Sequence, residues 1–217
     1  MLSLEDITAT FNEAPPPRNM PTITPCYFVH ENDNPVVQYV INPQKNGPWV
    51  AGGSCLAWYQ HKSCFSDIDV YFKNEKQYDR LTKELLQNLS DIGLIISNIY
   101  KTENAVTYKI KSRDTGKSMP AIQFIKKNWF QNPQEVINSF DITVCQIAWD
   151  GHRIIYNNSF VDDEKNRVLR FSSISPSSHR RLVKYMCYGY WPHDGCIEQL
   201  VQDSNIDWNS STFEDYS

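Results

Sequence analysis

An eight-residue stretch in the first third of the chain alternates between apolar and acidic residues, and it limits the folds available. The stretch is Phe65-Ser66-Asp67-Ile68-Asp69-Val70-Tyr71-Phe72. Successive side chains of a β-strand point to opposite faces, so a strand here would bury Ile68 and Val70 on one face. It would turn Asp67 and Asp69 toward the other. The sequence therefore predicts a sheet with an apolar face and a pair of carboxylates on the opposite face.

Helical and strand patterns alternate along the rest of the chain. They predict further strands at 26–29, 36–41, 94–100, 105–111, 120–125, 142–149 and 152–156. They predict helices at 3–11, 54–60, 75–92, 132–139, 175–189 and 195–203, with a polar connection at 160–168. The helix at 75–92 is amphipathic, and Gly93 is a suitable stop for it. This mixture predicts an α/β (α+β) fold in which helices flank a mixed β-sheet.

The length of 217 residues favours one domain, or one domain with an appendage. Prolines are concentrated near the N-terminus, and they predict an extended arm because proline fixes φ and lacks an N–H donor. We expect three parts: an N-terminal segment with this proline-rich arm at 1–25, a core at 26–160, and a helical extension at 161–217 that packs on the core.

Composition restricts the classes of function. The chain has 21 basic and 25 acidic residues, a net charge of −4, which disfavours a broad nucleic-acid surface but leaves room for a local basic patch. No apolar run is long enough for a membrane span, and the N-terminus does not read as a secretory signal. The six cysteines lack CxxC spacing. We therefore expect reduced thiols, no membrane association and a cytoplasmic protein, in the host cytoplasm if the chain is viral.

The tripeptide Gly52-Gly53-Ser54 precedes the carboxylate strand by twelve residues. Glycines allow the backbone to approach a ligand closely, because no Cβ is in the way. Backbone amides at a turn that leads into a helix form an anion site, and the serine adds a hydroxyl donor. This tripeptide is therefore a candidate binding site for a triphosphate.

Asp67 and Asp69 would lie about 7 Å apart along one strand face. Two such carboxylates are costly without a compensating charge, and the neighbouring residues 64–72 include no basic side chain. Hard oxygen ligands suit Mg²⁺ or Mn²⁺, which would keep phosphate oxygens and waters as further ligands. A third carboxylate, for which Asp141 is the candidate, would complete a two-ion site when an NTP is bound.

These motifs resemble the signature of the polymerase-β-type nucleotidyltransferase superfamily, and more loosely the small nucleotidyltransferase-like proteins of phages and large viruses. The resemblance extends over residues 49–190, and its matching motifs are Ala51–Ser54, Ser66–Asp69, Phe140-Asp141 and Lys184-Tyr185. It implies that Asp67, Asp69 and Asp141 are catalytic metal ligands. It also implies nucleotide contacts by Gly52, Gly53, Ser54, Lys184 and Tyr185.

Some of these residues have a second interpretation. Asp141 follows a predicted helix, where aspartate often serves as a turn residue. Arg180, Arg181 and Lys184 would meet phosphates or form an ordinary solvated helix face. Tyr185 would stack on a base or belong to the core.

The resulting hypothesis is Mg²⁺-dependent transfer of a nucleoside monophosphate from an NTP to an acceptor hydroxyl, with release of pyrophosphate. The acceptor is open: an RNA or DNA 3′ end, a protein side chain or a small molecule. A non-catalytic interaction module on the same fold is the alternative, with an antitoxin-like, regulatory or virion-associated role. A nucleotide phosphohydrolase using the same carboxylates is a third possibility. The sequence indicates neither the base preference nor the oligomeric state.

Overall fold

The computed structural model describes residues 36–62 and 67–202, and the chain divides into two compact units. The first, which we call the sheet unit, comprises, among the described residues, 36–62, 67–139 and 146–156. The second, which we call the C-terminal unit, comprises, among the described residues, 140–145 and 157–202. Residues 140–145, expected in the core, are thus grouped with the C-terminal residues. The predicted helix at 3–11, the proline-rich arm and the strand at 26–29 lie outside the described residues.

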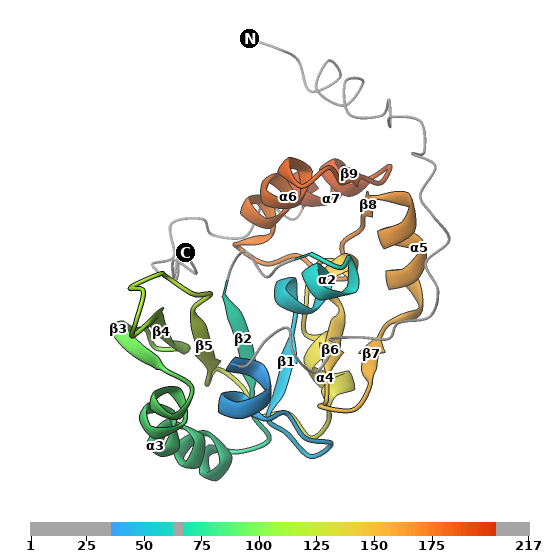
Figure 1. Cartoon of the computed structure of the whole chain (residues 1–217). Coiled ribbons are helices and arrows are strands. Elements are labelled where there is room, and N and C mark those ends of the chain that lie inside the picture. The colour runs from blue at the N-terminus through green and yellow to red at the C-terminus, as the bar shows by residue number, and fades with distance from the viewer. Residues whose placement is uncertain (1–35, 63–66, 203–217) are drawn as a thin grey trace. The chain divides into compact units, whose positions relative to one another are not determined.

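A seven-stranded mixed sheet forms the framework of the sheet unit, with the order β3-β4-β5-β2-β1-β6-β7 (Figure 1). Its strands are β1 (Trp49–Ala51), β2 (Ile68–Tyr71), β3 (Leu94–Lys101), β4 (Ala105–Ser112), β5 (Ile122–Ile125), β6 (Ile147–Trp149) and β7 (Ile154–Tyr156). β2 pairs in parallel with β5, and the other neighbouring strands of this sheet pair antiparallel. The predicted α/β architecture with a mixed sheet flanked by helices is confirmed.

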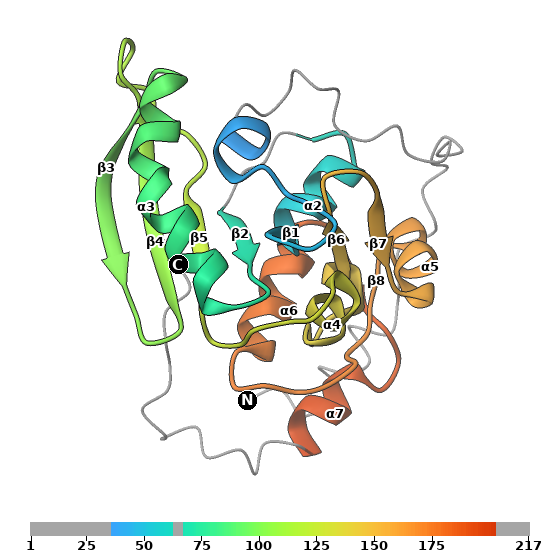
Figure 2. The same ribbon diagram turned by 90° about the horizontal axis from the view of Figure 1, so that it is seen from below.

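Helix α3 (Glu75–Asp91) lies beside β4 and β5 on one face of the sheet (Figure 2). Its buried residues are Leu81, Leu85 and Leu89. Its Tyr78 ring stands edge-on to Phe72 and Phe124 of the sheet. Ile68, Val70 and Phe72 are fully buried on this face, as the alternation predicted. Asp69 therefore points to the face opposite α3.

Two further helices of the sheet unit also follow from local sequence signals. α2 (Gly53–Tyr59) begins directly after β1, and its Trp58 ring contacts Trp149 edge-on. α4 (Pro133–Asn138) begins where Asn132 caps it, accepting a hydrogen bond from the Glu135 amide at 3.0 Å. Both helices were predicted.

Three predicted elements are wrong. Residues 36–41 form a π-helix, η1 (Val36–Ile41), instead of a strand, because the buried residues 36, 37, 40 and 41 recur at helical spacing. The predicted strand 142–149 is divided into an isolated bridge at Ile142, a short 3-10 helix η2 (Thr143–Cys145) and β6. The predicted connection 160–168 contains α5 (Asn158–Asn166), which buries Phe160, Asp163 and Glu164 at positions i, i+3 and i+4.

The C-terminal unit is mostly helical. It contains η2, α5, β8 (Val168–Leu169), α6 (Ser178–Cys187), β9 (Trp191–Pro192) and α7 (Cys196–Gln202). Its buried Asp163 accepts a hydrogen bond from Thr143 and pairs with Arg170. This pairing ties η2 to α5 and to the segment after β8. Across the described part of the chain, no helix has the length and apolarity that a bilayer crossing requires.

Candidate active site

Strand pairing brings the glycine motif and the carboxylates together within the sheet unit. β1 and β2 are antiparallel neighbours, and Ala51 lies opposite Asp69. The end of β1 therefore meets the start of β2, and Gly52 and Gly53 follow β1 beside the residues that begin β2. Gly52 is held there by its amide, which donates to the Ile147 carbonyl at 2.9 Å. Two motifs that lie twelve residues apart in the sequence thus occupy one end of a strand pair.

The turn at Gly52 needs glycine. Its backbone has φ 81° and ψ −140°, a conformation that side chains with a Cβ rarely adopt. Gly52 is the N-cap of α2 and makes no side-chain capping bond, so the first helical amides rely on other partners. The predicted glycine turn that leads into a helix is therefore present at Gly52.

Ser54, the third residue of the motif, has a hydroxyl that is buried without a hydrogen-bond partner among the described residues. The residue is only 1% exposed. A buried hydroxyl without a partner is costly, and in native structures it often marks a functional position or an absent ligand. This orphaned donor is the feature of the turn that suits a phosphate group.

The two carboxylates are only partly buried, and one of them has a basic partner. The Asp67 side chain is 23% exposed, and its Oδ1 lies 3.6 Å from the Lys109 Nζ. Lys109 lies on β4, two strands away from β2 in the sheet. The expectation that no cation balances this acidic strand is therefore wrong. Residues 64–72 do lack basic side chains, but the sheet supplies one from 42 positions further along the chain.

Polar residues next to Asp69 were missed by the sequence analysis. Asp69 lies beside Gln123 on β5, and Gln123 lies opposite Thr107 on β4. The Gln123 Nε2 donates to the Thr107 Oγ1 at 2.8 Å, and both residues are largely buried. A clue was present in the sequence, because Gln123 and Thr107 are polar residues inside otherwise apolar strands.

The donor set can be tested against a divalent cation. Among the described residues, no group of three or more His, Cys, Asp or Glu side chains is placed to hold a metal ion. Asp67 and Asp69 offer two carboxylates, which fits Mg²⁺, an ion that commonly binds one or two carboxylates and completes its shell with waters and substrate phosphates. The residues thus suit an ion that arrives with a nucleotide, rather than a permanent metal centre.

Asp141, the predicted third ligand, lies in the C-terminal unit in a dense hydrogen-bond cluster. Its Oδ2 accepts from Arg181 Nη1 at 2.6 Å and from Ser175 Oγ at 3.1 Å, and it also accepts from Ser178. The Asp141 side chain is 4% exposed, whereas that of Arg181 is 38% exposed. Asp141 therefore joins the start of α6 to the segment before η2. Its role as a metal ligand stays a prediction.

Lys184 and Tyr185, the two predicted nucleotide contacts on α6, have different environments. Lys184 is exposed. Tyr185 is 5% exposed, and its ring stands edge-on to Tyr188 and Tyr190 at centroid distances of 5.8 and 5.9 Å. The observed role of Tyr185 is thus in the core of the C-terminal unit, and its predicted nucleotide contact stays a prediction.

A buried thiol accompanies the Asp141 cluster. Cys145 lies at the end of η2, and burial raises its pKa to about 12. Hydrogen bonding with Tyr185 opposes this effect without cancelling it. Such a thiol stays protonated and unreactive at neutral pH. Among the described cysteines, Cys55, Cys145 and Cys196 are buried and Cys187 is exposed, all as free thiols, as expected for reduced cysteines.

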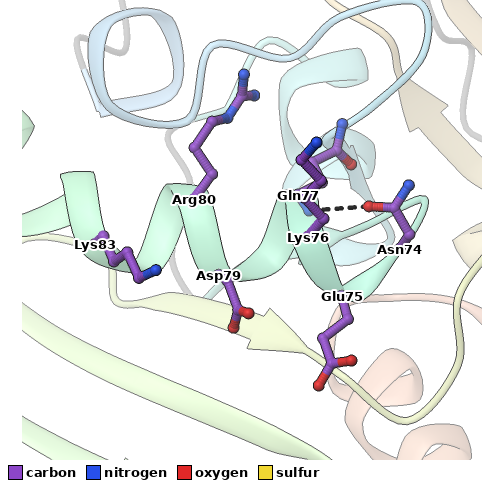
Figure 3. Close-up of a pocket in the computed structure, with 7 residues that line it drawn as sticks. All are labelled: Asn74, Glu75, Lys76, Gln77, Asp79, Arg80 and Lys83. Atoms are coloured by element: carbon purple, nitrogen blue, oxygen red, sulfur yellow. Dashed lines mark hydrogen bonds between the residues drawn. The ribbon is translucent and has the colours of Figure 1, made fainter.

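A cavity of about 630 Å³ lies over the first turns of α3 (Figure 3). The residues that line it are Asn74, Glu75, Lys76, Gln77, Asp79, Arg80 and Lys83. Figure 3 shows that these side chains point in different directions around the helix, rather than toward a common centre. None of them belongs to the predicted site.

Comparison with known proteins places the chain in a family. Residues 25–167 match the profile of a family described as "Gabija anti-defense 2 family protein". A curated relative, "Gabija anti-defense 2" of Bacillus phage SPbetaL7, is 26% identical over 134 residues. The match covers 60% of this chain and 30% of that relative, so the chain spans less than a third of the relative's length.

Two solved structures are similar to the chain. One is titled "Structure of tRNA-processing enzyme complex 3", with a TM-score of 0.49 and 16% identity, covering 72% of this chain and 43% of that one. The other, titled "The structure of CCA-adding enzyme apo form I", has a TM-score of 0.47 and 14% identity, and the match covers 72% of this chain and 38% of that one.

Proposed function

Because the chain belongs to the Gabija anti-defense 2 family, we propose that it is a phage anti-defence protein that acts in the host cytoplasm. We further propose that the strand pair β1–β2 carries out Mg²⁺-dependent nucleotidyl transfer. An NTP would lose pyrophosphate as its nucleoside monophosphate moves to an acceptor hydroxyl. The observation that carries this proposal is the antiparallel register of Ala51 with Asp69, which brings the glycine turn beside the two carboxylates.

Each part of the strand pair has a chemical task in this proposal. The turn at Gly52 and Gly53 would let the triphosphate approach the backbone, and the buried Ser54 hydroxyl would donate to a phosphate oxygen. Asp67 and Asp69 would hold the cation that accompanies the nucleotide. When bound, divalent ions supply charge stabilisation at the phosphoryl group and lower the pKa of the attacking hydroxyl.

Lys109 would have to move when the cation binds. Its ammonium group now lies within ion-pair distance of Asp67, on a side chain that is 41% exposed. An exposed lysine is flexible, and an ion pair of this kind is worth about 0–1 kcal/mol. Displacement from Asp67 would therefore cost little, and the released ammonium group would be available to a phosphate.

A non-catalytic interaction module is the second candidate, and Asp141 is the observation that favours it. Its carboxylate already bonds Arg181 and two serine hydroxyls. If this cluster only stabilises the fold, the site has two acidic residues, Asp67 and Asp69, instead of three. The protein would then act by binding a host defence protein, and it would catalyse no reaction.

Transfer of label from α-³²P-NTPs tests the proposal. The full chain is incubated with each NTP and Mg²⁺ or Mn²⁺, alone and with host extract, and label in macromolecules is counted. We expect incorporation by the wild type and none by Asp69→Asn. The matched control is Asp79→Asn, which removes an exposed carboxylate of α3 and should leave incorporation unchanged.

Two results would reject the transferase proposal. One is the absence of label with every NTP although the wild type binds a host protein stoichiometrically without NTP or metal, which would establish the interaction module. The other is equal incorporation by wild type and Asp69→Asn, which would place any activity elsewhere.

A further inference from the structure

The sheet face that carries Asp69 continues beyond it as a polar row. From Asp69 on β2, the register leads to Gln123 on β5, to Thr107 on β4 and to Tyr100 on β3. Residues in register across neighbouring strands point to the same face of a sheet. The row is largely buried at Gln123 and Thr107, whereas Tyr100 is 53% exposed. An aromatic ring is thus presented where this polar row reaches the edge strand β3.

Two lysines lie on the same face as this row. Every second residue of β4 faces the same way, so Lys109 and Lys111 share the face of Thr107. The opposite face of β4 is apolar and buried, with Tyr108 and Ile110 in the core. The two lysines lie about 7 Å apart along the strand. Lys109 is the partner of Asp67, whereas Lys111 forms no ion pair with any described residue.

The charge of the chain is distributed unevenly around these strands. Residues 94–127, which span β3, β4 and β5, carry seven basic and two acidic residues, a net charge of +5. The whole chain has a net charge of −4, so all other residues together are strongly acidic. A concentrated basic region in an acidic protein is the electrostatic feature expected of a local nucleic-acid surface.

The exposed ring of Tyr100 is held in place by a neighbour on the same face. Asn98 Nδ2 donates to the Tyr100 Oη at 2.8 Å, and the register puts Asn98 beside Lys109. A fixed and exposed aromatic ring next to lysines has the composition of a single-strand binding surface, in which bases stack on rings and phosphates meet cations.

We propose that this face, formed by Lys109, Lys111, Asn98 and Tyr100, binds single-stranded nucleic acid, and that the nucleotidyl acceptor is its 3′ end. Lys111, and Lys109 once released from Asp67, would contact phosphates, while Tyr100 stacks on a base. From Lys109 the 3′ end would meet Asp67, whose Oδ1 lies 3.6 Å from the Lys109 Nζ. This inference rests on the proposed function, because the acceptor must end at the Asp67–Asp69 pair, but binding itself needs neither catalysis nor metal.

Fluorescence anisotropy with 5′-fluorescein-labelled 20-mers, one of RNA and one of DNA, tests this surface without NTP or Mg²⁺. We expect binding of at least one probe by the full-length wild type. Tyr100→Ala should weaken it by about fivefold or more, the loss expected for one stacking ring. Lys111→Gln should weaken it and reduce the slope of log K against log salt by about 0.7. The controls are Tyr39→Ala and Lys83→Gln, whose side chains are exposed on η1 and α3.

The outcomes separate this inference from the proposed function. Binding that is reduced by both variants and by neither control supports the surface, even if no label is ever transferred. Absence of binding to both probes at low salt overturns the inference. Label transferred to a protein or a small molecule by a chain that binds neither probe would also overturn it, while leaving the transferase proposal intact. Equal losses in test and control variants would show non-specific attraction and would reject the assigned face.

Discussion

Asp67 and Asp141 have contrasting environments, although the sequence motifs predict both as metal ligands. Asp67 lies in the sheet unit with its side chain 23% exposed, 3.6 Å from the ammonium group of Lys109, whose side chain is 41% exposed. Asp141 lies in the C-terminal unit with its side chain 4% exposed, bonded to Arg181 and two serine hydroxyls. A carboxylate with a weak, displaceable partner can accept a metal ion, whereas a saturated and buried one stabilises its surroundings. The contrast is why we propose chemistry for the strand pair and expect the Asp141 cluster to contribute mainly to stability.

The largest expected effect concerns how well a thiol reagent reaches the buried Cys145 beside the Asp141 cluster. Burial raises the pKa of Cys145 to about 12, so this thiol stays protonated at pH 8 and is a poor nucleophile. We expect iodoacetamide to label the exposed Cys187 rapidly and to leave Cys145 unmodified, as measured by peptide mass spectrometry. Rapid labelling of Cys145 in the native chain would contradict the view that this region is closed.

The same thiol affects stability at high pH. Its pKa in the folded chain is above that of an unfolded cysteine, which is about 8.5. The folded state therefore holds the proton longer, and its advantage is present below about pH 8.5 and is lost as the pH rises toward 12. Thermal unfolding of Cys145→Ala should show a smaller fall in melting temperature between pH 8 and pH 10.5 than the wild type. An identical fall in both proteins would be the contrary result.

The next largest effect is on activity. Asp69→Asn removes a metal ligand without changing the size of the side chain, and we expect NTP-dependent labelling to fall at least about a hundredfold. Its free energy of unfolding should change by less than about 1 kcal/mol, because the side chain is only partly buried. Labelling assays and chemical denaturation measure the two quantities. If Asp69→Asn instead unfolded the protein, Asp69 would be a stabilising residue like Asp141, and the contrast between the two sites would not hold.

The opposite result is expected at Asp141. Asp141→Ala leaves Arg181 and two serine hydroxyls without their acceptor, and we expect a loss of about 2–3 kcal/mol in the free energy of unfolding. This loss is smaller than the roughly 3–5 kcal/mol of a fully buried pair, because the Arg181 side chain is 38% exposed. Urea denaturation measures this loss. Unchanged stability together with abolished labelling would instead support Asp141 as the third metal ligand.

The smallest effect is expected at Lys109. Lys109→Gln removes the ammonium group that competes for Asp67, so Mn²⁺ affinity in the presence of an NTP should rise by up to about fivefold. Isothermal titration calorimetry measures this change, with Lys83→Gln as the control on α3. A fall in affinity would mean that Lys109 acts mainly on the nucleotide phosphates and not against the cation.

Local sequence patterns predicted most of the sheet unit. The alternation in β2 and the helical period of α3 each depend on burial of one face, and the cap at Asn132 depends on side-chain chemistry within one turn. Where local signals conflicted with tertiary burial, the prediction was wrong. Residues 36–41 are rich in β-branched side chains that favour a strand, but η1 buries them at helical spacing. The acidic run in α5 suggested a polar connection, yet Asp163 and Glu164 are buried beside arginines.

The candidate site was predictable in its parts but not in its surroundings. The turn at Gly52 and the sheet face to which Asp69 points both follow from local geometry. The partner of Asp67 depends on strand order, because Lys109 becomes a neighbour only when β5 and β4 follow β2 in the sheet. A sequence scan offers one hint of this, namely two lysines alternating with apolar residues on β4, on the face opposite the core.

Mn²⁺ binding followed by electron paramagnetic resonance tests the central claim, that Asp67 and Asp69 form a metal–nucleotide site, most directly. Free Mn²⁺ is measured at increasing concentrations of the full-length chain, with and without a non-hydrolysable NTP analogue. We predict that Mn²⁺ is bound in the presence of the analogue by the wild type and by Asp79→Asn, and that Asp69→Asn does not bind it. Equal binding by wild type and Asp69→Asn, or no effect of the chain on free Mn²⁺ at any analogue concentration, would contradict the account.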